Sequence, residues 1–292
     1  MVVNDPIYDY VISGNGVRTA GVTATLADAA ATSIDATGLT NTSAIELTSA
    51  NPNCLFIANS GKISNDNNVI VSDACAQLAL TDGNPFKSPS AFTATAAPTY
   101  NRAFTDGTMT TVCLPFALTE TEAATLGTFY QLSTFDGVDL HFTSVAEPAA
   151  NKPYLVIPTG TAITLSETNK SIAATPADLG ASITSVDFIG TLAATTIPAS
   201  DETNSYFAYN NGELVKVTTQ AATLPAFRGY FKVSTDAISK ARRLGVSFDN
   251  NATGITNVKK ANGKAVYFDL QGRRVSKPNK GLYVVNGKKV VF

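Results

Sequence analysis

The chain has 292 residues, of which 44% are hydrophobic and only 15% are charged, so Thr, Ser, Asn and Ala must cover much of its surface. The length predicts about two domains, and the sequence contains no run of 18 apolar residues that could form a membrane-spanning helix. The net charge divides into −13 for residues 1–226 and +11 for residues 227–292. The basic residues are scattered and form no recognisable motif, which argues against a nucleic-acid partner and favours a solvated basic face.

The first ten residues, MVVNDPIYDY, lack both the charged and the apolar region of a signal peptide. The chain is therefore either cytosolic or follows a signal peptide that was removed or lies outside this sequence. Features of the C-terminal end, described below, favour export.

Residues 1–90 contain short apolar segments separated by polar turns. The steps from Ile34 to Leu55, then to Val69 and then to Leu78 are 21, 14 and 9 residues, and the first step suits one rung of a leucine-rich or β-solenoid stack. We therefore expect a β-rich N-terminal segment that forms the end of a solenoid. The Ala-rich residues 22–34 predict a short helix within it.

Residues 91–250 consist of short segments rich in Thr, Val, Phe and Tyr, with apolar residues in alternation. Asp136-Gly137 and Asn211-Gly212 predict hairpin turns, because these residue types tolerate positive φ. The pattern predicts an antiparallel β-sandwich. The exception is residues 118–127, where Thr119 and Glu122 have capping-box spacing and Gly127 predicts the end of a helix.

Residues 251–292 are expected to form a separate small β-hairpin domain at the C-terminus. Leu282 to Val285 alternate into a turn at Asn286-Gly287, and Lys288 to Phe292 return. A block of this size has too small a core to be stable alone, so we expect it to dock on its neighbour or on a partner.

The sequence holds no recognisable catalytic or cofactor motif, and it predicts a protein that is not an enzyme and uses no cofactor. His141 is the sole histidine, and alternation places it with Asp139 and Thr143 on a solvated strand face. Paired carboxylates could serve a glycoside hydrolase, but as helix-start or turn residues they have a simpler explanation. These pairs are Glu120 with Glu122, Asp136 with Asp139, and Asp201 with Glu202.

The three cysteines do not have metal-ligand spacing. Cys54 and Cys113 lie in apolar runs and are interpreted as small buried residues. A disulfide between Cys54 and Cys75 is the one pairing that the sequence leaves open.

Aromatic residues gather at Tyr206, Phe207 and Tyr209, just before the Asn211-Gly212 turn, and again around Arg228. Alternation places Arg228 and Tyr230 on the same strand face. They could form an exposed stacked pair that holds a sugar or a peptide, although packing in the core or on an ordinary surface is the simpler explanation.

The C-terminal stretch GKAVYFDLQGRRVSKPNKGLYVVNGKKVVF resembles the terminal segment of many secreted and surface proteins of gut Bacteroidetes. The shared motifs are YFDLQGRRV, GLYVV and KKVV, which begin at residues 267, 281 and 288. The resemblance implies sorting by a type IX-like secretion route, with the secretion or surface-attachment machinery as partner. The motif residues that it carries over are Asp269, Gly272, Arg273, Gly281, Tyr283, Lys288 and Lys289.

A second resemblance covers residues 45–235. The phrases NPNCLFIANSG, LALTDGNPFKSPSAFTA, YNRAF, VCLPFAL, KPYLVIP and LPAFRGYFKV are similar to a β module that is frequent in the same surface proteins, often after leucine-rich repeats. The resemblance implies a location and an architecture, and it brings no catalytic residue.

Taken together, these features predict an all-β, secreted or cell-surface, non-enzymatic protein that adheres to a glycan or a host protein. The first alternative is a structural spacer or a self-associating surface subunit. A carboxylate-based glycoside hydrolase is the least favoured alternative. The terminal hairpin would offer a free edge that a sorting partner could recognise through strand pairing.

Overall fold

The computed structural model describes residues 2–3, 8–14, 23–218, 220–238 and 244–248, and in the C-terminal part only residues 267–268, 274–275, 282–285 and 288–291. The described residues are all-β apart from two short helices, α1 (Glu120–Leu126) and α2 (Thr235–Ile238). The chain divides into two units, Met1–Phe248 and Asp249–Phe292. Neither described helix has the length or the apolar sequence needed to cross a lipid bilayer.

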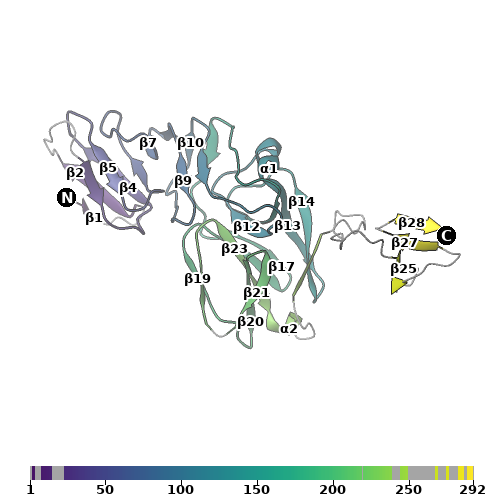
Figure 1. Cartoon of the computed structure of the whole chain (residues 1–292). Helices are drawn as coiled ribbons and strands as arrows, with labels where there is room; N and C mark the ends of the chain where they lie inside the picture. Colours follow the sequence, from purple (N-terminus) through teal and green to yellow (C-terminus); the bar gives the residue numbers. More distant parts are fainter. Residues whose placement is uncertain are drawn as a thin grey trace. The chain divides into compact units, whose positions relative to one another are not determined.

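The first part of the chain is a β-solenoid-like stack of coils, drawn from purple to blue in Figure 1. This confirms the predicted solenoid character. The helix predicted at residues 22–34 is wrong for the described residues 23–34, because residues 23–26 form a strand, residues 27–32 a turn and loop, and residues 33–34 the start of the next strand. β3 (Thr23–Leu26) and β5 (Glu46–Ser49) make a parallel pair. The main parallel ladder consists of β2 (Tyr10–Gly14), β4 (Ser33–Leu39), β6 (Leu55–Ile57) and β7 (Val69–Val71), with β1 (Val2–Val3) antiparallel to β2.

The rungs of this stack become shorter along the chain. Tyr10 lies beside Ile34, Ile34 beside Phe56 and Phe56 beside Val69, so the successive steps are 24, 22 and 13 residues. The decreasing spacing of apolar residues in the sequence has its origin here. Ile34 and Phe56 are buried between the coils, together with Leu47 and Cys54.

After β7 the chain reverses and builds two further parallel pairs. β8 (Ala74–Cys75) returns antiparallel to β7 and lies parallel to β10 (Phe92–Ala94). β9 (Ala79–Thr81) lies parallel to β11 (Thr99–Asn101). A strand from a distant part of the chain, β16 (Lys170–Ile172), pairs antiparallel with β10. The strand pairing therefore continues across residue 90, where the sequence suggested a domain boundary.

Buried asparagine side chains join neighbouring coils. The Nδ2 atom of Asn53 donates to the carbonyl oxygens of Thr81 and Asn84, both at 2.9 Å, and its Oδ1 accepts from Thr81 N at 2.7 Å. Asn68 bonds in the same way to the backbone of Ala79. An amide side chain carries both donors and an acceptor, so it can satisfy buried backbone groups that no strand pairs.

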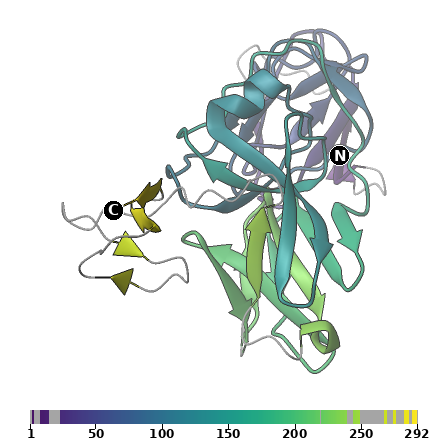
Figure 2. The same cartoon turned by 90° about the vertical axis from the view of Figure 1, so that its right-hand side faces the viewer.

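Two five-stranded sheets form most of the remainder of the first unit (Figures 1 and 2). They share a core in which the Phe142 ring of one sheet lies 6.3 Å from Phe188 and 6.1 Å from Phe231 of the other. The first sheet contains, in spatial order, β12 (Thr110–Cys113), β15 (Pro153–Pro158), β13 (Gly127–Phe135), β14 (Asp139–Val145) and β24 (Gly245–Phe248). The second contains β17 (Gly180–Ile183), β18 (Val186–Thr191), β23 (Arg228–Ser234), β20 (Asn204–Asn210) and β21 (Glu213–Val217).

Both predicted hairpin turns of this region are confirmed. Asp136-Gly137 lies between the antiparallel strands β13 and β14, and Gly137 has a φ of 94°. Asn211-Gly212 joins β20 to β21 with φ values of 48° and 82°. A separate antiparallel pair, β19 (Thr195–Ile197) and β22 (Ala222–Leu224), packs on the second sheet through Ile197 and Leu224.

The predicted helix is also confirmed. In α1, the Thr119 side chain accepts from Glu122 N, and Glu122 Oε2 accepts from Thr119 N, which completes the capping box. Glu122 is fully buried and forms an ion pair of 2.9 Å with the buried Lys170. The Lys170 ammonium also contacts Glu167.

The second unit contains a four-stranded sheet in the order β26 (Arg274–Val275), β25 (Tyr267–Phe268), β27 (Leu282–Val285) and β28 (Lys288–Val291). β27 and β28 are antiparallel, with Val285 opposite Lys288. The residues of the predicted Asn286-Gly287 turn lie outside the described part of the chain.

The Glu122–Lys170 pair predicts a specific loss of stability in acid. Burial opposes ionisation of Glu122, but the bonds from Lys170 and from backbone N–H groups outweigh it and lower its pKa from 4.5 to about 2. A carboxyl whose pKa is depressed on folding stabilises the protein above its unfolded pKa, and this contribution is lost as the pH falls through the folded value. We expect Glu122→Gln to lower the free energy of unfolding by about 3 kcal/mol at pH 7.

The difference between wild type and Glu122→Gln should then shrink as the pH falls from 4.5 to about 2. Urea denaturation at a series of pH values measures it. Glu120→Gln, an exposed position in the same first turn of α1, is the control, and we expect it to change stability by less than about 0.5 kcal/mol. A Glu122→Gln deficit that stays constant across this pH range would contradict the assignment.

Candidate functional site

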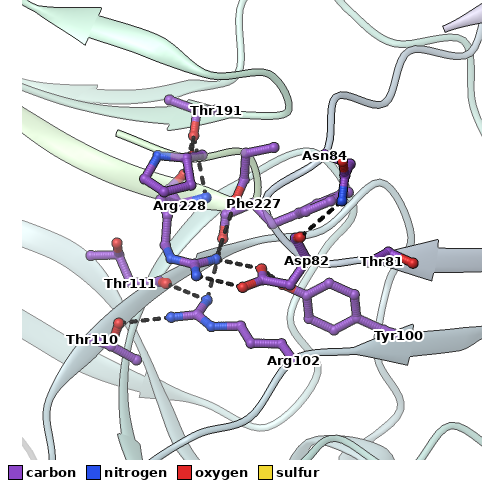
Figure 3. A network of polar contacts seen from close by, with 12 residues as sticks. Thr81, Asp82, Asn84, Tyr100, Arg102, Thr110, Thr111, Thr191, Phe227 and Arg228 are labelled. Carbon is purple, nitrogen blue, oxygen red and sulfur yellow. Dashed lines mark hydrogen bonds and ion pairs between the residues drawn. The ribbon is translucent and has the colours of Figure 1, made fainter. Parts of the chain in front are cut away.

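Residues from three of the phrases singled out in the sequence meet in one buried polar network (Figure 3). Asp82 follows β9, Tyr100 lies in β11, and Arg228 begins β23. The Arg228 guanidinium forms a two-pronged ion pair with the Asp82 carboxylate, with distances of 2.6 and 2.7 Å. The Tyr100 hydroxyl donates to the same carboxylate at 2.7 Å. We call these residues, together with Arg102, Thr110, Thr111, Thr191 and Phe227, the Arg228 network.

Arg102 extends the network toward β12. Its guanidinium donates to Thr111 O at 3.0 Å, to Thr110 Oγ1 at 2.9 Å and to Phe227 O at 3.4 Å. It also lies 4.3 Å from the centre of the Phe104 ring. Burial lowers the pKa of Arg102 to about 10. The side chain stays positively charged at neutral pH and compensates buried carbonyl groups.

The charges of the network stabilise each other. Burial alone would raise the pKa of Asp82, but the hydrogen bonds from Arg228 and Tyr100 outweigh it and hold the pKa below its usual range. For Arg228, burial disfavours the charged form, while the bond to Asp82 favours it, and the net pKa is raised. Both groups are therefore held in their charged forms, which is unsuitable for proton transfer at neutral pH.

Phe227 has an uncommon backbone conformation at the centre of the network. Its φ is +63°, in the left-handed region that bulky residues rarely adopt, and its side chain is fully buried. Its N–H donates to Thr191 O at 2.7 Å, while its carbonyl accepts from Arg102 and from Cys113 N. These bonds hold a conformation that would otherwise cost of order 1–3 kcal/mol.

Of the two interpretations that the sequence left open for Arg228 and Tyr230, the structure supports packing within the protein and not an exposed stacked pair. The Arg228 side chain is only 17% exposed and is engaged by Asp82. Tyr230 is 9% exposed and packs with Ile197 and Val217. Strand alternation in the sequence could not reveal the partners of either residue. Asp82 is 146 residues away from Arg228, and the strands that cover Tyr230, β19 and β22, are separated in the chain by β20 and β21.

The other candidates from the sequence also have roles in the fold. His141 Nε2 lies 3.1 Å from Asp136 Oδ2, and Asp136 Oδ1 accepts from the N–H groups of Val138 and Asp139. Hydrogen bonds from the Asp139 N–H and from His141 lower the pKa of Asp136 to about 2. Asp201 accepts two backbone N–H groups in the same manner. Each of the three carboxylate pairs thus contains one residue with a role in the fold: Glu122 at the start of α1, Asp136 in a hairpin turn and Asp201 in a loop.

The cysteines Cys54, Cys75 and Cys113 are all free and buried. Burial raises the pKa of each thiol, to about 12 for Cys54 and Cys113 and to about 11 for Cys75. They are therefore protonated and unreactive at neutral pH. Among the residues that the structure describes, no cluster of three or more His, Cys, Asp or Glu is placed to hold a metal ion.

Two adjoining cavities lie beside the Arg228 network, and they are the candidate binding site. The larger has a volume of about 550 Å³ and the smaller of about 180 Å³. Met109, Tyr209 and Gly212 line both, and we call the two together the Tyr209 groove. The larger cavity is further lined by Phe207, Glu213, Leu214, Lys216, Ile238, Leu244, Gly245 and Val246, and the smaller by Arg102, Ala103, Phe104, Thr105, Thr108, Thr110 and Asn211.

The Tyr209 groove lies between edge strands of the two facing sheets. β21 is the last strand of one sheet and β24 the last of the other. The Asn211-Gly212 turn closes over residues 108–109, and a Cβ atom at Gly212 would lie 3.2 Å from Thr108 Cγ2. The positive φ and the close approach both require glycine at this position.

The sequence pointed to this site only in part. Tyr209 belongs to the aromatic cluster noted before the Asn211-Gly212 turn, but nothing local to that cluster indicates which ring lines a cavity. Of the residues taken from the terminal resemblance, Asp269, Gly272, Arg273 and Gly281 lie outside the described residues. Tyr283 lies in β27, and Lys288 and Lys289 lie in β28.

Comparison of the chain with family models, with curated proteins and with solved structures finds no match.

The Asp82–Arg228 ion pair predicts strong coupling between two distant residues. We expect Asp82→Ala and Arg228→Ala each to lower the free energy of unfolding by about 3 kcal/mol, because either change leaves a buried charge without its partner. The double variant should lose much less than the sum, giving a coupling energy of about 2 kcal/mol, measured by chemical denaturation of the four proteins.

Asp187 and Lys232 provide the matched control for this cycle. Their charged atoms are 3.5 Å apart, and both side chains are more than a third exposed, so their coupling energy should be below about 1 kcal/mol. Equal coupling in the two cycles would show that the Asp82–Arg228 pair contributes no more than a surface contact.

Proposed function

We propose that this chain is a non-enzymatic surface or secreted protein that binds a ligand at the Tyr209 groove. The observation that carries the proposal is a contrast between two regions. In the Arg228 network and around Glu122, the charged side chains have partners within the protein. At the groove, Tyr209, Asn211, Glu213 and Lys216 have no side-chain hydrogen bond or ion pair to any other described residue.

The architecture that fits this proposal is an antiparallel β-sandwich module carried on the end of a solenoid. The two facing sheets support a sandwich, although β14 and β24 pair in parallel and the predicted purely antiparallel arrangement is wrong for that pair, and the coils of residues 10–101 support the solenoid end. The Arg228 network joins them through Asp82 and Arg228. Such a scaffold would hold the Tyr209 groove in a fixed shape, which favours binding because little order must be gained when the ligand arrives.

The proposed location rests on the terminal segment. Its motifs resemble those of type IX-sorted proteins of gut Bacteroidetes, and β28 is the outermost strand of its sheet. An edge strand can be recognised by a partner that adds a strand to it. We propose that the segment addresses the chain to the secretion or surface-attachment machinery, with adhesion as the use of the exported protein.

A second candidate function is that of a spacer or self-associating subunit. The Arg228 network favours it, because a rigid connection between coils and sheets suits a stalk as well as a binding protein. The opposite charges of residues 1–226 and 227–292, −13 and +11, would also favour contacts between copies.

Binding and spacing are distinguished by a direct assay of the whole chain. We expect the immobilised protein to bind a panel of host-surface glycans and glycoproteins saturably in biolayer interferometry, while the heat-denatured chain does not. Sedimentation of the same sample measures self-association. Self-association without binding to any member of the panel would favour the spacer.

Removal of residues 281–292 tests the proposed location. In the bacterium that produces the protein, we expect the truncated chain to lose display and secretion while its total amount in the cell is maintained, as measured by immunoblotting of cell and medium fractions. The unchanged cellular amount is the control for folding and turnover. Undiminished display would refute the sorting role.

A further inference from the structure

We infer that the Tyr209 groove is a binding site for an oligosaccharide. The inference rests on the proposed function and names the chemical class of its ligand.

The dimensions of the Tyr209 groove suit a short chain of sugar rings. The volumes of about 550 and 180 Å³ adjoin through Met109, Tyr209 and Gly212, and the larger lies within the range of roughly 300–1,000 Å³ that is usual for ligand sites. An elongated ligand could extend from one cavity into the other, with Tyr209 at the junction. A compact ligand would occupy only one of them.

The side chains of the groove match the two kinds of surface that a sugar presents. Sugar rings have apolar C–H faces and a border of hydroxyl groups, each of which donates and accepts. Tyr209 is half-buried between the cavities and offers both a ring and a hydroxyl. Thr105, Thr108 and Asn211 line the smaller cavity with groups that both donate and accept.

The Tyr209 hydroxyl is a polar group that a ligand could bond to. Burial raises its pKa, so it is a neutral donor and acceptor at physiological pH. No described residue forms a hydrogen bond with it. Because Tyr209 is only half-buried and its hydroxyl is not among the buried atoms that lack a partner, this hydroxyl is accessible from outside the protein, and a ligand hydroxyl at the junction of the cavities would bond to it.

The charges of the groove argue against other ligand classes. Among the described lining residues the charged groups are Glu213, Lys216 and Arg102. The charges of Glu213 and Lys216 offset each other, and the Arg102 guanidinium is engaged by Thr110, Thr111 and Phe227, so the described lining presents no cluster of free basic groups to a polyanion. A nucleic acid or phosphorylated ligand would need an excess of basic groups. A peptide added as a strand would pair with the backbone edge of a single strand, whereas the residues that line the cavities come mainly from β20, β21, β24 and the segment before β12.

The test is a glycan array with the whole chain, followed by calorimetric titration of a glycan that binds. We expect Tyr209→Ala to weaken the affinity by about tenfold or more, and Tyr209→Phe, which keeps the ring, by about two- to tenfold. Tyr206→Ala is the matched control, because Tyr206 lies on the same strand but packs on its opposite face. Its affinity should stay within about twofold of wild type.

Lys216→Ala gives a second variant should Tyr209→Ala fail to fold in thermal melting. Lys216 is exposed at the border of the larger cavity, and its removal should weaken binding by about two- to tenfold. Wild-type affinity in Tyr209→Ala and Lys216→Ala would place the glycan elsewhere on the protein; it would overturn this inference and the groove named in the proposed function, while a binding role for the chain would stand. Binding that survives periodate oxidation of the sugars would overturn the ligand class alone, and no binding to any glycan or protein would overturn the proposed function itself.

Discussion

The two-pronged ion pair between Asp82 and Arg228 is the interaction on which the first unit depends. Each charge is stabilised by the other, because a largely buried charge that loses its partner destabilises the fold strongly. Asp82 follows β9 in the coils, and Arg228 begins the central strand of a sheet. Their pairing therefore decides that coils and sheets abut in one arrangement. Phe227, held with a positive φ beside it, shows that the chain accepts local strain to keep this geometry.

The Tyr209 groove results from the same arrangement of coils and sheets. Arg102 and Thr110 belong to the Arg228 network and also line the smaller cavity. Thr111, the next residue of β12, bonds through its hydroxyl to both N and O of Gly229 at 2.9 Å. These bonds fix β12 against β23, and the loop that precedes β12 then faces the Asn211-Gly212 turn. One set of polar contacts thus provides both the rigidity of the scaffold and the wall of the proposed binding site.

The sequence predicted those features whose causes are local. Three local features were predicted correctly, because residues close together in the sequence determine each of them. They are the capping box of Thr119 and Glu122 and the turns at Asp136-Gly137 and Asn211-Gly212. The spacing of Ile34, Leu55 and Val69 likewise indicated stacked coils. The prediction failed or was incomplete where residues distant in the sequence determine the local structure. Residues 23–26 and 33–34 of the Ala-rich stretch form strands because neighbouring rungs pair with them, and Arg228 pairs with a carboxylate that no local pattern indicates. The groove depends on strands from three parts of the chain and could not be predicted.

The separation of 146 residues between Asp82 and Arg228 has a consequence for how the chain acquires its structure. Contacts between residues far apart in sequence form slowly, because a long loop must be ordered before they contribute any stability. The coil that contains Asp82 lacks the compensating charge of Arg228 until most of the two sheets that follow in the chain have assembled. Partial folding from the N-terminus is thereby discouraged, and the coils and sheets should gain and lose their order as one cooperative body. For a polypeptide proposed to leave the cell, this delay would lengthen the time during which chaperones and translocation factors meet it unfolded.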